Sequence, residues 1–214
     1  EYRENEKPQN FGKYLFKATN NLTPIVWSSI NDVIVGAKEI MGFLKKVSRL
    51  VASENLPVTW TTPKPLNFPV QMMCYKKESK RVKTKMGDSI IKLSIQSDTD
   101  EIDVRKTAQS ICPNLIHSLD ASCLMLAVIK AKDKGVTNFS LIHDSFGCVA
   151  PDVHKLSEAI REAFCEVYEQ DVLTNWAMEM KQMLSEKNAK KFPHIPERGN
   201  LDLSLVKQSI FFCV

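Results

Sequence analysis

The chain has 214 residues, 43% of them hydrophobic and 25% charged, so it is long and apolar enough to bury a core. Its formal net charge of +4 permits nucleic-acid binding without requiring it, so any basic surface has to be local. The 6 cysteines never form a Cys-x-x-Cys pair, and the 4 histidines are scattered, which argues against a disulfide-dense secreted domain and a structural zinc site. We expect reduced thiols in a cytosol-like compartment.

Two further expectations follow from the hydropathy of the chain and from its first residue. We find no signal peptide and no stretch long and apolar enough to span a bilayer, so no membrane partner is expected. The chain begins at Glu1 rather than at a methionine, which we interpret as the mark of a fragment or a processed product.

The first predicted element is one long amphipathic helix. Thr23 and Pro24 form a helix-start signal, a capping hydroxyl followed by a proline in the first turn. Apolar residues then recur every three or four positions as far as Val51. Residues 58–73 contain three prolines, Pro63, Pro65 and Pro69, and are predicted to form short strands and turns.

Residues 75–100 are predicted to form a basic β-hairpin. Six basic residues precede a turn at Gly87 and Asp88, and apolar and polar residues then alternate as in a half-exposed strand; the basic residues are Lys76, Lys77, Lys80, Arg81, Lys83 and Lys85. A solvated surface hairpin that touches nothing is an equally good interpretation of this pattern.

The second half of the chain is predicted to be a helix, a hairpin and two further helices. Residues 114–135 are expected to be a loop that enters a helix, and residues 139–151 a strand, a tight turn at Asp144 and Ser145, and a second strand. The core face of the first following helix is predicted to hold Val153, Leu156, Ile160, Phe164 and Val167, and that of the second Val172, Trp176, Met180 and Met183.

Two short polar segments are candidates for chemistry. An aspartate in a turn, such as Asp144, most often caps its own backbone, but apolar residues on both sides predict a turn at the rim of a buried sheet. A carboxylate fixed there is a ligand type that Mg²⁺ takes. His117, Ser118 and Asp120 are expected at a helix start, where backbone N–H groups favour anions, although a plain helix cap is the better interpretation of this segment by itself.

Together these segments closely resemble a known family. Residues 112–126, CPNLIHSLDASCLML, and residues 139–147, FSLIHDSFG, resemble the C-terminal region of the single-subunit RNA polymerases of phages and mitochondria. Most of the remaining chain takes part in the resemblance, through residues 14–17, 60–63, 68–70, 101–106 and 199–203.

The resemblance implies an α/β fold that is part of a right-hand polymerase. Residues 1–117 would be a fingers-side portion with late fingers helices, and the hairpin at residues 75–100 would occupy the place of the promoter-specificity loop. Residues 118–214 would be the C-terminal palm portion, an antiparallel β-hairpin backed by helices.

The resemblance also implies roles for individual residues. Asp144 would be the second metal-binding aspartate of a two-Mg²⁺ nucleotidyl transfer, and His143 would brace its turn. His117 would lie beside the nascent base pair, and Arg81, Lys83 and Lys85 would contact DNA. The loop is slightly shorter than in familiar phage enzymes, so individual base contacts do not carry over.

Two parts of the family's machinery have no counterpart in this sequence: the first catalytic aspartate, and a fingers helix with a lysine and a tyrosine. The chain is therefore expected to be inactive without an N-terminal portion or a partner subunit that supplies them. Its other partners would be a DNA template, nascent RNA and NTPs. The location would be the host cytoplasm if the source is viral, or alternatively the mitochondrial matrix.

Two other functions stay open from the sequence. A DNA polymerase of the bacterial repair type shares the palm and a His-Asp pair, but such enzymes usually have Glu where Ser145 stands. A non-catalytic nucleic-acid-binding subunit could have kept the fold, although the intact Asp144 argues against decay.

Overall fold

The computed structural model describes residues 14–87 and 89–210 and divides the chain into two compact units, Glu1–Met41 and Gly42–Val214. Helix α1 (Leu15–Val33) lies in the first unit and has no buried residue. Helix α2 (Val35–Ser53) crosses the boundary between the units, and all its buried residues follow that boundary.

The prediction of a single helix that starts at Pro24 is wrong in two respects. The helix begins nine residues earlier than Pro24, at Leu15, and it ends at Val33, because the backbone of Ile34 (φ −104°, ψ 63°) leaves the helical region. The Thr23 hydroxyl donates to the carbonyl of Thr19 at 2.8 Å, so Thr23 lies inside the helix and does not cap it. Pro24 is accommodated within α1.

The strands form three two-stranded antiparallel sheets among the described residues, so the predicted mixed α and β class is confirmed. Strands β1 (Val58–Thr61) and β2 (Pro69–Met72) confirm the short strands expected in residues 58–73. Strands β3 (Tyr75–Met86) and β4 (Ser89–Ile102) confirm the long hairpin. The third sheet pairs β5 (Ser140–Ile142) with β6 (Ser145–Gly147).

Helix α3 (Val104–Asp133) runs through the second unit for 30 residues and begins earlier than predicted. Asp103 caps it by accepting from the amide of Lys106 at 2.9 Å. The loop expected from residue 114 is absent: Asn114 and Pro113 both lie inside the helix, where the side-chain amide of Asn114 donates to the carbonyl of Ser110. His117, Ser118 and Asp120 are therefore in the middle of a helix, and the expected anion-binding helix start is wrong.

Helix α3 also passes a length-and-composition test for a membrane span, which the sequence was expected not to contain. Buried helices inside globular proteins pass the same test, so this is weak support for a span. In this chain α3 packs lengthwise on α4 (Val153–Glu169) and also contacts β2. Two apolar clusters and the ion pairs of Lys130 with Glu166 and of Lys134 with Glu158 join the two helices.

The two helices predicted after the second hairpin are present as α4 and α5 (Val172–Met183). A short 3-10 turn, Ala150–Asp152, precedes α4, and two short helices, α6 (Glu186–Ala189) and α7 (Ser204–Gln208), follow α5. The core face of α4 is shifted from the prediction: Leu156 and Val167 are buried, but Val153 is 51% exposed. On α5, Trp176 and Met180 are buried as predicted.

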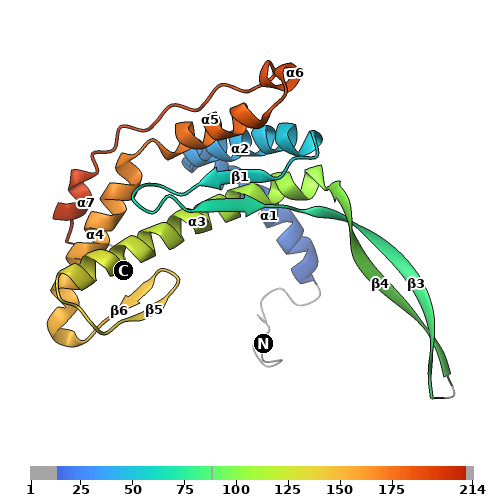
Figure 1. The fold of residues 1–214 in the computed structure, drawn as a ribbon, viewed down its shortest axis with the longest axis horizontal. Coiled ribbons are helices and arrows are strands. Elements are labelled where there is room, and N and C mark those ends of the chain that lie inside the picture. The colour runs from blue at the N-terminus through green and yellow to red at the C-terminus, as the bar shows by residue number, and fades with distance from the viewer. Residues whose placement is uncertain (1–13, 88, 211–214) are drawn as a thin grey trace. The chain divides into compact units, whose positions relative to one another are not determined.

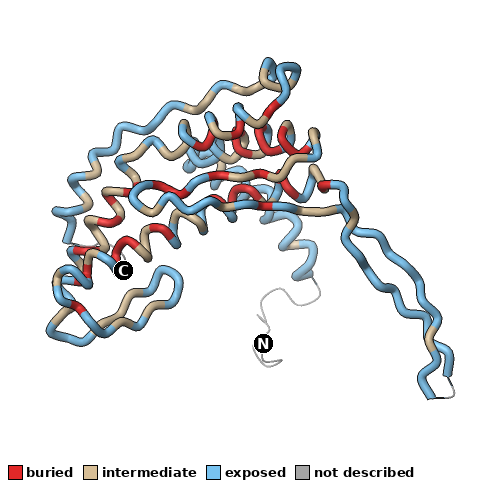
Figure 2. The backbone as a smooth tube through the Cα atoms, viewed as in Figure 1, coloured by how far each residue is buried: buried red, intermediate tan, exposed pale blue. Residues whose placement is uncertain are grey.

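The buried residues of the second unit lie mainly on α2, α3, α4, α5 and β1 (Figure 2). The ring of Phe43 on α2 meets the ring of Trp176 on α5 edge-on, with their centroids 6.2 Å apart. At the end of α2, the Glu54 carboxylate accepts from the backbone N–H and the hydroxyl of Ser185 and from the side chain of Asn188. The hydrogen bonds from Ser185 lower the pKa of Glu54.

We predict opposite effects from removing the hydroxyls of two buried threonines. Thr107 is 1% exposed, and its hydroxyl has no partner among the described residues, so Thr107→Val should leave the free energy of unfolding unchanged or raise it by up to about 1 kcal/mol. The Thr62 hydroxyl accepts from the amide of Phe68 at 2.8 Å, so Thr62→Val should cost about 1–3 kcal/mol. Urea unfolding of both variants measures the difference, and equal losses would contradict it.

Candidate metal-binding turn and nucleic-acid interface

A two-residue turn of His143 and Asp144 joins β5 to β6, one position earlier in the chain than predicted, because Ser145 already pairs with Ile142. His143 has a φ of 52°, a left-handed conformation that non-glycine residues seldom adopt and that is over-represented at functional sites. The Asp144 side chain is exposed, and it makes no hydrogen bond or ion pair with the residues that the structure describes. Its carboxylate is therefore available to a ligand.

The β5–β6 hairpin is held on the body of the second unit by one aromatic side chain of its own. Phe146 packs against two apolar clusters that contain Leu126 and Ala127 of α3 and Ala163 and Leu156 of α4. Figure 1 shows the hairpin beside the C-terminal half of α3. The hairpin that carries Asp144 thus packs against α3 and α4.

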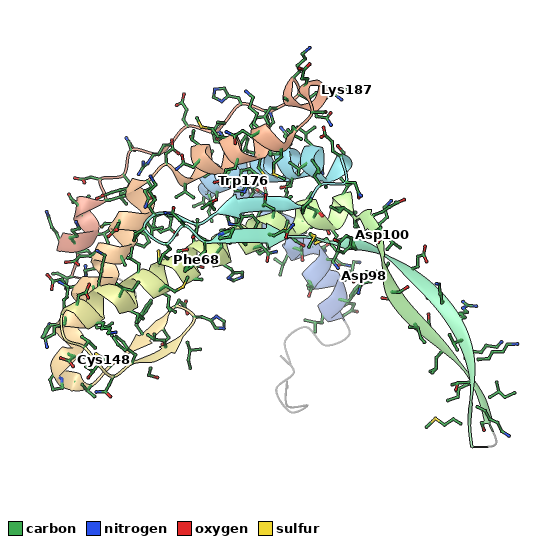
Figure 3. All side chains as sticks on the ribbon, viewed as in Figure 1. Phe68, Asp98, Asp100, Cys148, Trp176 and Lys187 are labelled. Atoms are coloured by element: carbon green, nitrogen blue, oxygen red, sulfur yellow. The ribbon has the colours of Figure 1, made fainter. Side chains whose placement is uncertain are left out.

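The expectation that this turn lies at the rim of a buried sheet is wrong for the described residues. The sheet has only two strands, and Ile142 is 69% exposed. The two strands approach each other closely at Gly147, where an added Cβ would lie 3.2 Å from the carbonyl oxygen of Ser140. Cys148, just beyond β6, is half-buried (Figure 3).

His117 is exposed on α3, and the residue next to it fixes that part of the helix to β1. The indole N–H of Trp60 donates to the Ser118 hydroxyl at 3.0 Å, and that hydroxyl donates to the carbonyl of Leu115 at 2.7 Å. Trp60 is only 3% exposed, so this is the buried partner that its N–H requires. The contact joins the two motifs at residues 60–63 and 112–126.

Asp120, one turn further along α3, is exposed and lies near Tyr168 of α4. Burial raises the pKa of Tyr168 to about 12, and Cys123 and Asp120 act on it in the same direction. The ring of Tyr168 also packs against that of Phe164, with centroids 4.5 Å apart. Tyr168 therefore stays protonated at neutral pH and serves as packing beneath the surface that carries Asp120.

The β3–β4 hairpin has one basic face. Directly opposed residues share a face of a sheet, and Arg81 faces Ser94, Lys83 faces Lys92, and Lys85 faces Ile90. The three basic residues predicted to contact DNA are thus on one side of the ribbon, and all are exposed. Lys92 joins them, although only the pairing register, and not its place in the sequence, reveals this.

The other face of the same hairpin carries most of its apolar side chains. Val82 faces Leu93, Thr84 faces Ile91, and Lys80 faces Ile95. Val82, Leu93 and Ile95 are 42%, 47% and 53% exposed. Figure 2 shows the ribbon exposed along its length outside the body of the second unit.

The donor set for a metal is incomplete within the described part of the chain. No group of three or more His, Cys, Asp or Glu side chains there could hold a metal ion. Asp144 supplies one exposed carboxylate, and a carboxylate oxygen is a ligand type that Mg²⁺ takes. Asp144, His117 and the basic face lie on three different elements, and the structure shows no hydrogen bond that joins these side chains to one another.

The family model for DNA-dependent RNA polymerase matches residues 2–191 of this chain. The chain belongs to the DNA-dependent RNA polymerase family. It is 36% identical over 212 residues to DNA-directed RNA polymerase 2, chloroplastic/mitochondrial, of Arabidopsis thaliana, an alignment that covers 98% of this chain and 20% of that protein. It is 33% identical over 211 residues to the DNA-directed RNA polymerase of Enterobacteria phage T3, covering 91% of this chain and 24% of the phage protein.

The alignments show that the chain corresponds to a fragment of these polymerases. A third relative, DNA-directed RNA polymerase 2A of Nicotiana tabacum, is 33% identical and is covered over 57% of its length. The resemblance to phage-type RNA polymerases is therefore confirmed, and the relatives include phage, mitochondrial and chloroplastic enzymes.

We predict that Ser118→Ala destabilises the polymerase fragment by about 1–3 kcal/mol, because it leaves the buried indole N–H of Trp60 without an acceptor. Ser53→Ala is the matched control. The Ser53 hydroxyl also donates to a carbonyl three residues earlier, Leu50, but it is exposed and accepts nothing in the described structure. Thermal unfolding of both variants compares them, and equal midpoints would contradict the role of the bond from Trp60.

Proposed function

We propose that this chain is the C-terminal catalytic portion of a DNA-dependent RNA polymerase with the right-hand fold. The observation that carries the proposal is the family match over residues 2–191, which includes the exposed and unpaired Asp144. In this proposal residues 1–117 belong to the fingers side and residues 118–214 to the palm, with the division inside α3.

Asp144 is proposed as the second metal-binding aspartate. The short turn, on a hairpin anchored through Phe146, constrains the backbone that carries this carboxylate. Mg²⁺, when bound, would neutralise negative charge on the reacting phosphates. His143 holds the left-handed corner of the turn next to Asp144, so its proposed contribution is to position the carboxylate.

His117 is proposed to lie beside the nascent base pair. It is exposed on α3 next to Ser118, whose bond to Trp60 holds the helix against β1. An exposed imidazole on a helix whose backbone is held in this way is available to contact a base or a ribose. The partners of such a site are a DNA template, nascent RNA and NTPs.

The basic face of the β3–β4 hairpin is proposed to bind duplex DNA. Lys83 and Lys92 are directly opposed, and like charges in that arrangement destabilise a sheet unless an anion lies against them. A two-stranded ribbon fits the major groove, and the phosphates on either side attract its lysines.

The proposal requires a further polypeptide. The first metal-binding aspartate and the lysine and tyrosine that contact the incoming nucleotide would come from an N-terminal portion or a partner subunit. In such an enzyme two polypeptides would each supply part of the metal-ligand set. The β5–β6 turn, with its single available carboxylate, fits this division. A subunit that only binds nucleic acid would need the basic face and would not need Asp144.

We predict that Asp144→Asn abolishes RNA synthesis by the reconstituted enzyme, with a loss of at least roughly 10²-fold, because it removes the charge of a metal-ligating oxygen. Asp133→Asn, which changes an exposed carboxylate at the end of α3, is the control and should leave the rate unchanged. Duplex DNA binding should survive both changes. Full synthesis by the Asp144 variant would exclude the metal role.

We predict that replacing Arg81, Lys83 and Lys85 together by glutamine weakens duplex DNA binding. The slope of log K against log salt should fall by about 0.9 for each phosphate that the hairpin no longer neutralises. The control replaces Lys187, Lys190 and Lys191 around α6, which changes the net charge equally at a place away from the hairpin (Figure 3). If both triple variants bind DNA with the same slope, binding depends on total charge and not on this face.

A further inference from the structure

The root of the β3–β4 hairpin is fastened by one side chain from outside it. Asn55 follows the end of α2, and its side-chain oxygen accepts from the backbone N–H of Ile102 at 2.8 Å. Its side-chain nitrogen donates to the backbone carbonyl of Asp100 at 3.2 Å. The amide thus bonds to the last part of β4 as a neighbouring strand would.

The hairpin is irregular where Asn55 holds it. Tyr75 pairs with Ile102, and the next pair is Lys77 with Asp98, so Lys76 alone faces residues 99–101. Such a bulge bends a strand and re-aims what lies beyond it. The Thr99 hydroxyl donates to the carbonyl of Lys76 at 3.1 Å inside the bulge.

A second attachment lies on the other side of the root. The backbone N–H of Asp103 donates to the carbonyl of Cys74 at 2.7 Å, and the Asp103 side chain caps α3. The bulge is therefore held between α2, through Asn55, and α3, through Asp103. In Figure 3 the labelled Asp100 and Asp98 mark the place where the hairpin leaves the body of the second unit.

Because the hairpin is long, a small change of its angle at the root produces a large displacement of its tip. A strand the length of β3 spans roughly 40 Å, so a tilt of about 10° at the root moves the tip by about 7 Å. That displacement exceeds the tolerance of a side chain that reads a base edge. A tether at the root therefore decides where the basic face is presented.

We propose that Asn55 is a positioning residue that sets the direction of the hairpin and so aligns its basic face with promoter DNA. The identity of the DNA partner rests on the proposed function, but the direction of the hairpin does not. Asn55 also has a φ of 57°, a conformation suited to asparagine or glycine, so glycine removes the side chain without straining the backbone.

The test compares Asn55→Gly with Asn67→Gly. Asn67 has a φ of 51°, is also exposed, and makes no side-chain hydrogen bond among the described residues, so its change matches the first in backbone and composition. Hydrogen exchange at the Ile102 amide should speed up by roughly tenfold in Asn55→Gly alone. Spin labels introduced as unnatural amino acids at Met86 and Lys187 should show a broader distance distribution in that variant alone.

Promoter-directed initiation and promoter-independent extension of an RNA primer separate positioning from general stability. In the reconstituted enzyme Asn55→Gly should lower promoter-directed initiation at least about tenfold, since misplacement of that size disrupts base contacts, and leave primer extension unchanged. Asn55→Asp keeps the acceptor for Ile102 and should recover part of the loss. An unchanged distance distribution, or equal losses in both assays, would overturn the proposal.

These experiments distinguish an error in the proposed function from an error in the proposed role of Asn55. If the wild-type mixture showed no promoter-directed synthesis, the DNA role of the hairpin would fall. The spin-label distances would still decide whether Asn55 sets the direction of the ribbon. A broadened distribution in Asn55→Gly would support that part, and an unchanged one would exclude it.

Discussion

The packing of α3 against its neighbours is the constraint on which the second unit depends. Near Ser118, α3 is fixed to β1 through the buried indole of Trp60, and near Leu126 it packs with α4 on Phe146 of the second hairpin. The surface that carries His117 and the turn that carries Asp144 therefore share one rigid element. Both side chains are exposed, although α3 supports the segments that carry them.

Much of the fold could be predicted from the sequence, because its strongest signals are local. Alternating polarity about Gly87 predicts the long hairpin, and the spacing of Trp176 and Met180 predicts the core face of α5. The errors concern where helices begin. Pro24 was interpreted as a helix start but lies inside α1, and the loop expected from residue 114 is part of α3, which also contains Pro113.

The candidate site was less accessible to sequence reasoning, because it depends on contacts between distant residues. The position of Asp144 in a turn could be predicted, but its support by Phe146 on two helices could not. Lys92 joins the basic face only through the pairing register with Lys83. Asn55 gives no signal in the sequence beyond a polar residue after a helix, and its two bonds to β4 appear only in the structure.

The proposed function makes this chain one part of a catalytic centre for RNA synthesis that a further polypeptide completes. The most direct measurement is Mg²⁺-dependent extension of an RNA primer on a DNA template, with NTPs and separately with dNTPs. The chain would be tested alone and mixed with the polypeptide encoded upstream of it. If the proposed function is right, the chain alone will not extend the primer, and the mixture will extend it with NTPs and not with dNTPs. Extension at an ordinary rate by the chain alone, or a preference for dNTPs, would contradict it.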